Sequence, residues 1–131
     1  MRFVLAGVVL AGSALMGWGL RPVGAQEDAS RPEFYTTKVA PIFQANCNKC
    51  HAGMFHRGGL SLRTREALLK GGHSGPAIVP GDPGKSLLVQ LIRHEGQTND
   101  PGPMPPKKPK LSDADVDVVE RWVNAGAIMP E

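Results

Sequence analysis

Hydrophobic side chains recur at intervals of three and four residues in three stretches of this chain, a pattern typical of helices with one buried face. In residues 32–50 these positions are Phe34, Tyr35, Val39, Ile42, Phe43 and Cys47. In residues 85–94 they are Leu87, Leu88, Leu91 and Ile92, and in residues 113–125 they are Val116, Val119, Trp122 and Val123. We expect three main helices, with the last packed near the first. Pro41 should kink or restart the first helix, because proline removes a helical hydrogen bond.

A short helix and long loops connect these stretches. Thr64 fits the N-cap of a helix over residues 65–70, which Gly71 would end. Ser112, followed by acidic residues, fits the N-cap of the last helix. The 16 glycines and 12 prolines leave little room for further helices or for strands. The sequence thus predicts an all-α protein with three main helices, one short helix and long ordered loops.

The N-terminus has the pattern of a secretory signal. A basic start at Arg2 precedes an apolar run over residues 3–20, and small residues at 23–25 provide a cleavage site. We expect cleavage after Ala25 and export to the periplasm or another extracytoplasmic compartment. The alternative is a retained membrane anchor, but the run is rich in glycine and alanine and only just long enough to span a bilayer, which favours cleavage.

Cleavage would leave a flexible, polar segment over residues 26–32 and one domain over residues 33–131. The signal carries Arg2 and Arg21 and no acidic residue, so its removal lowers the formal net charge from +3 to +1. The remaining charges form no cluster of the kind that binds nucleic acid. We therefore expect neither a nucleic-acid partner nor a stable membrane span in the mature chain.

The strongest chemical motif is Cys47-Asn48-Lys49-Cys50-His51, which contains both cysteines of the chain. Two cysteines separated by two residues and followed at once by histidine form the attachment pattern of haem c. Each thiol can form a thioether bond to one haem vinyl group, and the histidine can bind the iron. The motif therefore predicts one covalent haem, with His51 as an iron ligand.

The cysteine pair has three alternative interpretations, of which a simple disulfide across two intervening residues would be strained and uncommon. A thioredoxin-like redox pair is expected to begin a helix in a βαβ unit, and no such pattern is visible. A structural zinc site needs four ligands, and the scattered His56, His73 and His94 provide no second ligand pair. Haem attachment is the favoured interpretation.

The second axial ligand of the iron determines the chemistry, because an open site permits gas or peroxide reactions. Met104 lies between Pro103 and Pro105, which restrict the backbone around one thioether sulfur. His73 and His94 would instead give bis-histidine ligation, although His94 also fits a solvated cation at a helix end. Met54 and His56 are weaker candidates because they follow the attachment motif so closely. The residues alone favour Met104 and leave these alternatives open.

The chain resembles the planctomycete-type cytochrome C domains of the cytochrome c-like superfamily. The matching stretches are residues 39–43, 47–51, 58–62, 75–83, 86–88, 104–107, 111–112 and 122–127. The resemblance implies a cytochrome c-like fold around one haem c on Cys47 and Cys50, with His51 as proximal and Met104 as distal ligand. One departure is His73, where such domains commonly have an acidic residue, so His73 stays open as a ligand.

Together these observations predict an exported monohaem c-type cytochrome that carries single electrons and is not an enzyme. Its partners would be redox proteins that dock transiently at an exposed haem edge. One alternative is a haem enzyme or a gas or redox sensor with an open or bis-histidine iron. The other is an interaction module in which the haem mainly stabilises the fold.

Overall fold

The computed structural model describes residues 27–95 and 101–131, so the predicted signal over residues 1–25 lies outside the described residues. The described part is helical and contains no strand, only an isolated antiparallel bridge between Gly72 and Gly75. This confirms the predicted all-α class. None of its helices combines the length and hydrophobicity that crossing a bilayer requires.

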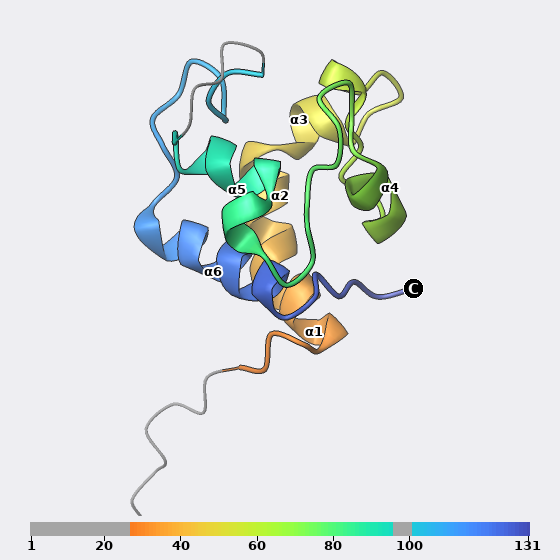
Figure 1. The fold of residues 1–131 in the computed structure, drawn as a ribbon, viewed down its shortest axis with the longest axis vertical. Helices are drawn as coiled ribbons and strands as arrows, with labels where there is room; N and C mark the ends of the chain where they lie inside the picture. Colours follow the sequence, from red (N-terminus) through yellow and green to blue (C-terminus); the bar gives the residue numbers. More distant parts are fainter. Residues whose placement is uncertain (1–26, 96–100) are drawn as a thin grey trace, which may run out of the picture.

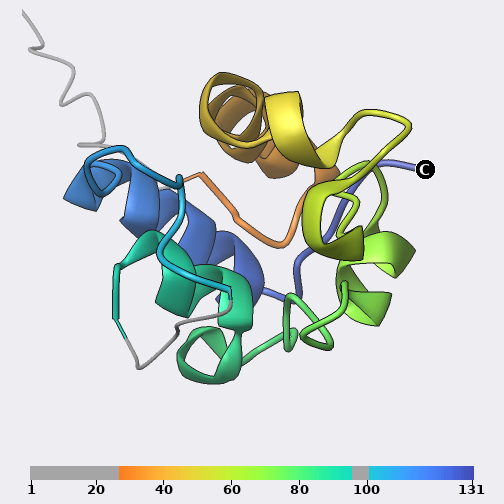
Figure 2. The same ribbon diagram turned by 90° about the horizontal axis from the view of Figure 1, so that it is seen from above.

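Figure 1 shows the helical elements, coloured in sequence order and joined by loops. In chain order they are α1 (Pro32–Phe34), η1 (Tyr35–Val39), α2 (Ala40–Asn46), α3 (Asn48–His51), η2 (Arg57–Gly59), α4 (Arg65–Lys70), η3 (Pro83–Lys85), α5 (Leu87–Ile92) and α6 (Asp113–Asn124). Figure 2 shows α2 and α3, in orange and yellow, opposite α5 in teal, with α6 in blue on one side and α4 in green on the other.

The first helical run restarts beside Pro41, as predicted. η1 is a π-helical turn, in which the Ala40 N–H donates to the Tyr35 carbonyl five residues back, and α2 then begins at Ala40. Pro41 therefore lies in the first turn of α2, where a missing N–H leaves no helical bond unmade. The wider turn accommodates the proline within one continuous helical path.

The two predicted N-caps are present. The hydroxyl of Thr64 accepts a hydrogen bond from the Ala67 N–H at 3.1 Å, and that of Ser112 accepts one from the Asp115 N–H at 3.1 Å. α4 ends before Gly71, whose φ of +74° favours glycine. These local signals were therefore sufficient to locate α4 and the start of α6.

α5 is shorter than the predicted helix over residues 85–94. Pro83–Lys85 form a separate 3₁₀ turn, because the Asp82 carboxylate accepts from the Lys85 N–H at 3.0 Å. The buried hydroxyl of Ser86 donates to the Asp82 carbonyl at 2.9 Å and accepts from the Val79 N–H at 2.9 Å. These contacts keep Ser86 outside the helix, and α5 begins at Leu87.

The core joins α6 to the N-terminal helical run through aromatic rings. Trp122 is fully buried, with its ring centroid 5.5 Å from that of Tyr35 and 5.9 Å from that of Phe43. The guanidinium of Arg121 lies over the Phe34 ring, 5.2 Å from its centroid. This confirms the predicted packing of the last helix against the first.

Residues 27–31 form a turn in contact with this core region. The Glu27 carbonyl accepts from Arg121 Nη2 at 3.0 Å, and the Glu27 carboxylate pairs with Lys38 at 2.9 Å. The Asp28 carboxylate accepts from the Ser30 N–H at 2.9 Å. The flexibility expected of residues 26–32 stays a prediction.

Candidate functional site

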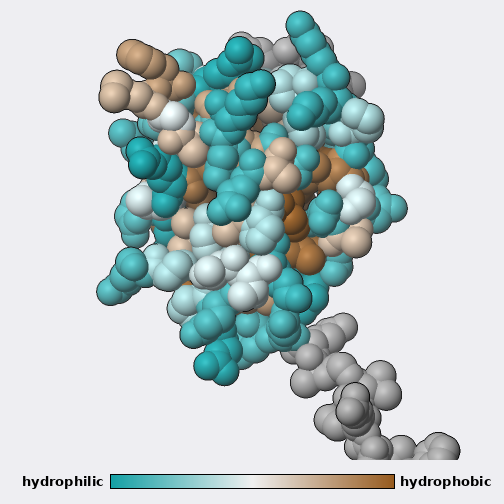
Figure 3. Space-filling model, turned by 180° about the vertical axis from the view of Figure 1, so that it is seen from behind, coloured by the Kyte–Doolittle hydropathy of each residue, from teal (hydrophilic) through white to brown (hydrophobic). Residues whose placement is uncertain are grey.

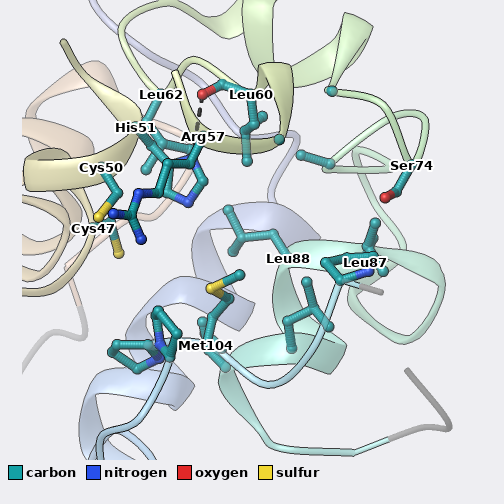
Figure 4. Close-up of a pocket in the computed structure, with 18 of the residues that line it drawn as sticks. Cys47, Cys50, His51, Arg57, Leu60, Leu62, Ser74, Leu87, Leu88 and Met104 are labelled. Carbon is teal, nitrogen blue, oxygen red and sulfur yellow. Dashed lines mark hydrogen bonds between the residues drawn. The ribbon is translucent and has the colours of Figure 1, made fainter. Parts of the chain in front are cut away.

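A cavity of about 330 Å³ lies between α3 and α5, a volume within the range of ligand sites. The loop after α3, the loop after α4 and the loop before α6 also line it (Figure 4). Its walls are mainly aliphatic, formed by Leu60, Leu62, Leu88, Leu91, Ile92 and Leu111. A site of this composition favours a large apolar ligand over a small polar one.

Both cysteines line this cavity as free, half-buried thiols. Cys47 interrupts the helical path between α2 and α3, with φ −125°, and its carbonyl accepts from the N–H groups of Cys50 and His51 at 3.1 Å each. These two bonds hold Cys47, Cys50 and His51 within one turn. The spacing of the motif thus brings all three side chains to one wall of the cavity (Figure 4).

Burial raises the pKa of the Cys47 thiol to about 11, and the neighbouring Cys50 adds to the shift. The thiol is therefore protonated at neutral pH. A thioredoxin-like cysteine works as a thiolate, and its surroundings lower its pKa. The opposite shift here argues against the redox-pair reading.

The imidazole of His51 is oriented by the loop that follows it. Nδ1 of His51 lies 3.3 Å from the Leu60 carbonyl oxygen, and the Leu62 N–H donates to the His51 carbonyl at 2.9 Å. Because a carbonyl only accepts, Nδ1 must carry the proton, and Nε2 of the neutral ring keeps its lone pair. A hydrogen bond of this kind is typical of histidines that bind a metal through the other nitrogen.

Met104 lies on the other side of the cavity from His51 (Figure 4). Its side chain is half-buried and packs against the hydrophobic core. The Met104 N–H donates to the Leu91 carbonyl at 3.0 Å, and the Met104 carbonyl lies 3.1 Å from Nε2 of His94. The thioether therefore belongs to a backbone segment that is bonded to the end of α5.

The other candidate ligands do not line the cavity. Met54 is 86% exposed, and His56 is half-buried in the loop after α3. His73 is exposed and lies so close to Gly59 that a Cβ there would stand 2.8 Å from its ring. Of the residues predicted from sequence, the structure brings together Cys47, Cys50, His51 and Met104.

His94 has a role that the sequence analysis missed. The sequence indicates either an iron ligand or a solvated cation at this position, whereas the His94 ring lies against the backbone carbonyl of Met104. The only local signal for such a contact is the position of His94 at the end of the predicted helix. Glycine is more common than histidine at a position that ends a helix. Nothing in the sequence pairs His94 with a residue ten positions later.

The zinc reading finds no further support in the structure. Within residues 27–95 and 101–131, no group of three or more histidine, cysteine, aspartate or glutamate side chains could hold a metal ion. A closed zinc site needs four such ligands. The donors that do converge are two thiols, one imidazole and one thioether.

Comparison with known protein families gives a match that contains the attachment motif. Residues 47–108 match the family model described as Planctomycete cytochrome C. The matched segment begins at Cys47 and contains Cys50, His51 and Met104. Neither the curated proteins nor the solved structures contain a match to this chain. Over residues 47–108 this match confirms the resemblance predicted from the sequence, so this segment of the chain is similar to the Planctomycete cytochrome C family.

Proposed function

We propose that the protein is a monohaem c-type cytochrome with a cytochrome c-like fold, which carries single electrons outside the cytoplasm. The observation that carries this proposal is the convergence of Cys47, Cys50, His51 and Met104 on one apolar cavity. The family match supports a haem c protein independently of that geometry. The electron-carrier role and the His51–Met104 ligation are the further steps of the proposal.

The donor set fits haem c. Cys47 and Cys50 would hold the porphyrin through thioether bonds, and Nε2 of His51 and the sulfur of Met104 would bind the iron. When bound, the haem iron supplies a one-electron couple between its ferric and ferrous states. The aliphatic walls match the apolar faces of a porphyrin.

The chain's own contribution to electron transfer is to fix the two ligands and to exclude water. His51 is held through its Nδ1 contact to Leu60, and Met104 through its N–H bond to Leu91. Ligands held in this way move little between oxidation states. A low-polarity cavity and a thioether ligand both favour the ferrous state and thus a higher reduction potential.

Export is proposed from the N-terminal sequence. The signal pattern over residues 1–25 directs the chain out of the cytoplasm, to the periplasm or an equivalent compartment. Free cysteine pairs tend to oxidise there, and thioether attachment would protect both sulfurs.

Partner docking is proposed beside the attachment motif. All four site residues lie in two segments, residues 34–65 and 101–112. Together these segments contain eight lysines and arginines and no acidic residue. Met54 and Phe55, close behind His51 in sequence, are 86% and 91% exposed. Figure 3 shows hydrophobic side chains projecting from a largely hydrophilic surface. An acidic redox partner with an apolar contact would fit these features, and its binding would be transient.

The test is spectroscopic. A pyridine haemochrome spectrum and intact mass of the exported protein should report one haem on two thioether bonds and the loss of residues 1–25. The ferric visible spectrum should contain a methionine–iron charge-transfer band that disappears in Met104→Ala. A high-spin wild-type spectrum would instead support an enzyme or sensor with an open iron site. A colourless sample with the mass of the bare polypeptide would contradict the whole proposal.

A further inference from the structure

α5 ends in a Schellman motif with an unusual residue at its centre. The Glu95 N–H donates to the Gln90 carbonyl at 3.0 Å, and the His94 N–H donates to the Leu91 carbonyl at 3.2 Å. His94 occupies the left-handed position of this motif, with φ +57°. Glycine is the common residue there, because a Cβ makes this conformation costly. A histidine at this position therefore invites a functional explanation.

The side chain of His94 provides that explanation. Nε2 of His94 lies 3.1 Å from the Met104 carbonyl oxygen, and because a carbonyl only accepts, the ring donates. The left-handed backbone of His94 thus accompanies a ring that reaches the Met104 segment. A glycine would end α5 equally well but could not make this bond.

Both polar backbone groups of Met104 are bonded to the end of α5. Its N–H donates to the Leu91 carbonyl, which also accepts from the His94 N–H, and its carbonyl accepts from the His94 ring. Pro103, Pro105 and Pro106 have no N–H, so Met104 provides the only backbone donor in residues 103–106. The segment therefore has few other bonds that could hold it in place.

We propose that His94 is a positioning residue for the distal iron ligand: its ring fixes the Met104 backbone and thereby holds the Met104 thioether in the cavity. The inference rests on the His51–Met104 ligation proposed above. His94 does not touch the iron in this proposal and is not a ligand. Its removal should loosen the methionine without emptying the haem site.

The experiment measures how readily exogenous imidazole displaces Met104 from the ferric haem of the intact, haem-loaded protein. The test variant is His94→Asn, which tolerates the left-handed backbone but has a side chain too short to reach the Met104 carbonyl. His94→Gly, which accepts positive φ without strain, removes the ring in a second way. His94→Gln keeps a long N–H donor, and His73→Ala is the matched control, an exposed histidine outside the cavity. Met104→Ala gives the affinity of imidazole for the haem iron when no methionine competes for it.

Loss of one hydrogen bond predicts that imidazole binds His94→Asn and His94→Gly about five-fold more tightly than wild type. Their methionine–iron band should weaken, while His94→Gln and His73→Ala should match wild type. If the affinities of His94→Asn and His94→Gly equal that of His73→Ala, the positioning role is wrong although the ligation stands. If wild type and Met104→Ala share one spectrum and one affinity, the ligation itself is wrong and this inference falls with it.

Discussion

The indole N–H of Trp122 donates to the carbonyl oxygen of Ile128 at 2.7 Å, within the closing turn that follows α6. The same ring lies at the centre of the aromatic contacts that join α6 to the N-terminal helical run. One side chain thus connects the C-terminal segment to the helices that lead to the attachment motif. Trp122 therefore joins the two ends of the domain, together with the Arg121 contacts to Phe34 and Glu27.

Trp122→Ala should lower the free energy of unfolding by about 3–5 kcal/mol, the range for deleting a large buried aromatic side chain. Trp122→Phe keeps most of the apolar volume but leaves the Ile128 carbonyl without its donor, so a smaller loss of about 1–3 kcal/mol is expected. Denaturant titration of the haem-loaded protein measures both values. A Trp122→Phe variant as stable as wild type would contradict the role assigned to the hydrogen bond, and equal stability of the two variants would contradict the role assigned to the buried volume.

Met104→His should lower the reduction potential, because a thioether stabilises ferrous iron better than a second imidazole does. Spectroelectrochemical titration measures the change. Met54→His is the matched control, because Met54 is almost fully exposed and does not line the cavity, and it should leave the potential unchanged. An unchanged potential in Met104→His would show that Met104 is not an iron ligand.

Single replacement of Cys47 or Cys50 by alanine should leave a protein whose haem is held by one thioether bond. The double variant should hold its haem without any covalent bond, because the chain contains no third cysteine. Acid–acetone extraction followed by intact mass distinguishes these states. Retention of covalent haem by the double variant would contradict the attachment sites.

Reversal of charge at Lys107 and Lys108 should slow electron transfer to an anionic acceptor and speed it to a cationic one. Both lysines are exposed and lie close to Met104 in sequence, in a segment without acidic residues. Ferricyanide and a hexaammine complex of ruthenium(III) serve as the two acceptors in stopped-flow measurements. The ratio of the ferricyanide rate to the ruthenium rate should be lower than in wild type at low ionic strength. It should return toward the wild-type value as salt screens the charges.

Lys70→Glu is the control for this effect, since Lys70 is also exposed but belongs to α4, next to Glu66 in the same helix. Per unit of charge altered, the ratio should change less in this variant than in the double reversal at 107 and 108. An equal change per unit of charge in both variants would show that only the net charge matters and that no docking face is favoured.

Local signals were enough to predict much of this molecule. Thr64 and Ser112 cap the helices that were expected to follow them, because a hydroxyl that accepts a backbone N–H acts within a few residues. The motif from Cys47 to His51 likewise fixes the relative placement of its side chains through a single turn. For the same reason, three of the four candidate site residues could be grouped from sequence alone.

Contacts between distant positions were harder to foresee. The length of α5 depends on the Ser86 hydroxyl, which bonds to the backbone of Val79 and Asp82 in the preceding loop. The contact of His94 with Met104 depends on how the segment before α6 returns to the end of α5. Hydrophobic periodicity records which face of a helix is buried but carries no information about such bonds.

The π-helical turn η1 also sets the angle at which α1 faces the rest of the domain. Each residue advances an α-helix by about 100°, so the wider turn shifts α1 relative to α2 by a fraction of that angle. In this arrangement the Phe34 ring lies under the Arg121 guanidinium of α6. Deleting one residue from Tyr35–Val39 would remove the wide turn and change the geometry of this contact without altering the sequence from Cys47 to His51, so the two ends of the first helical run can be varied separately.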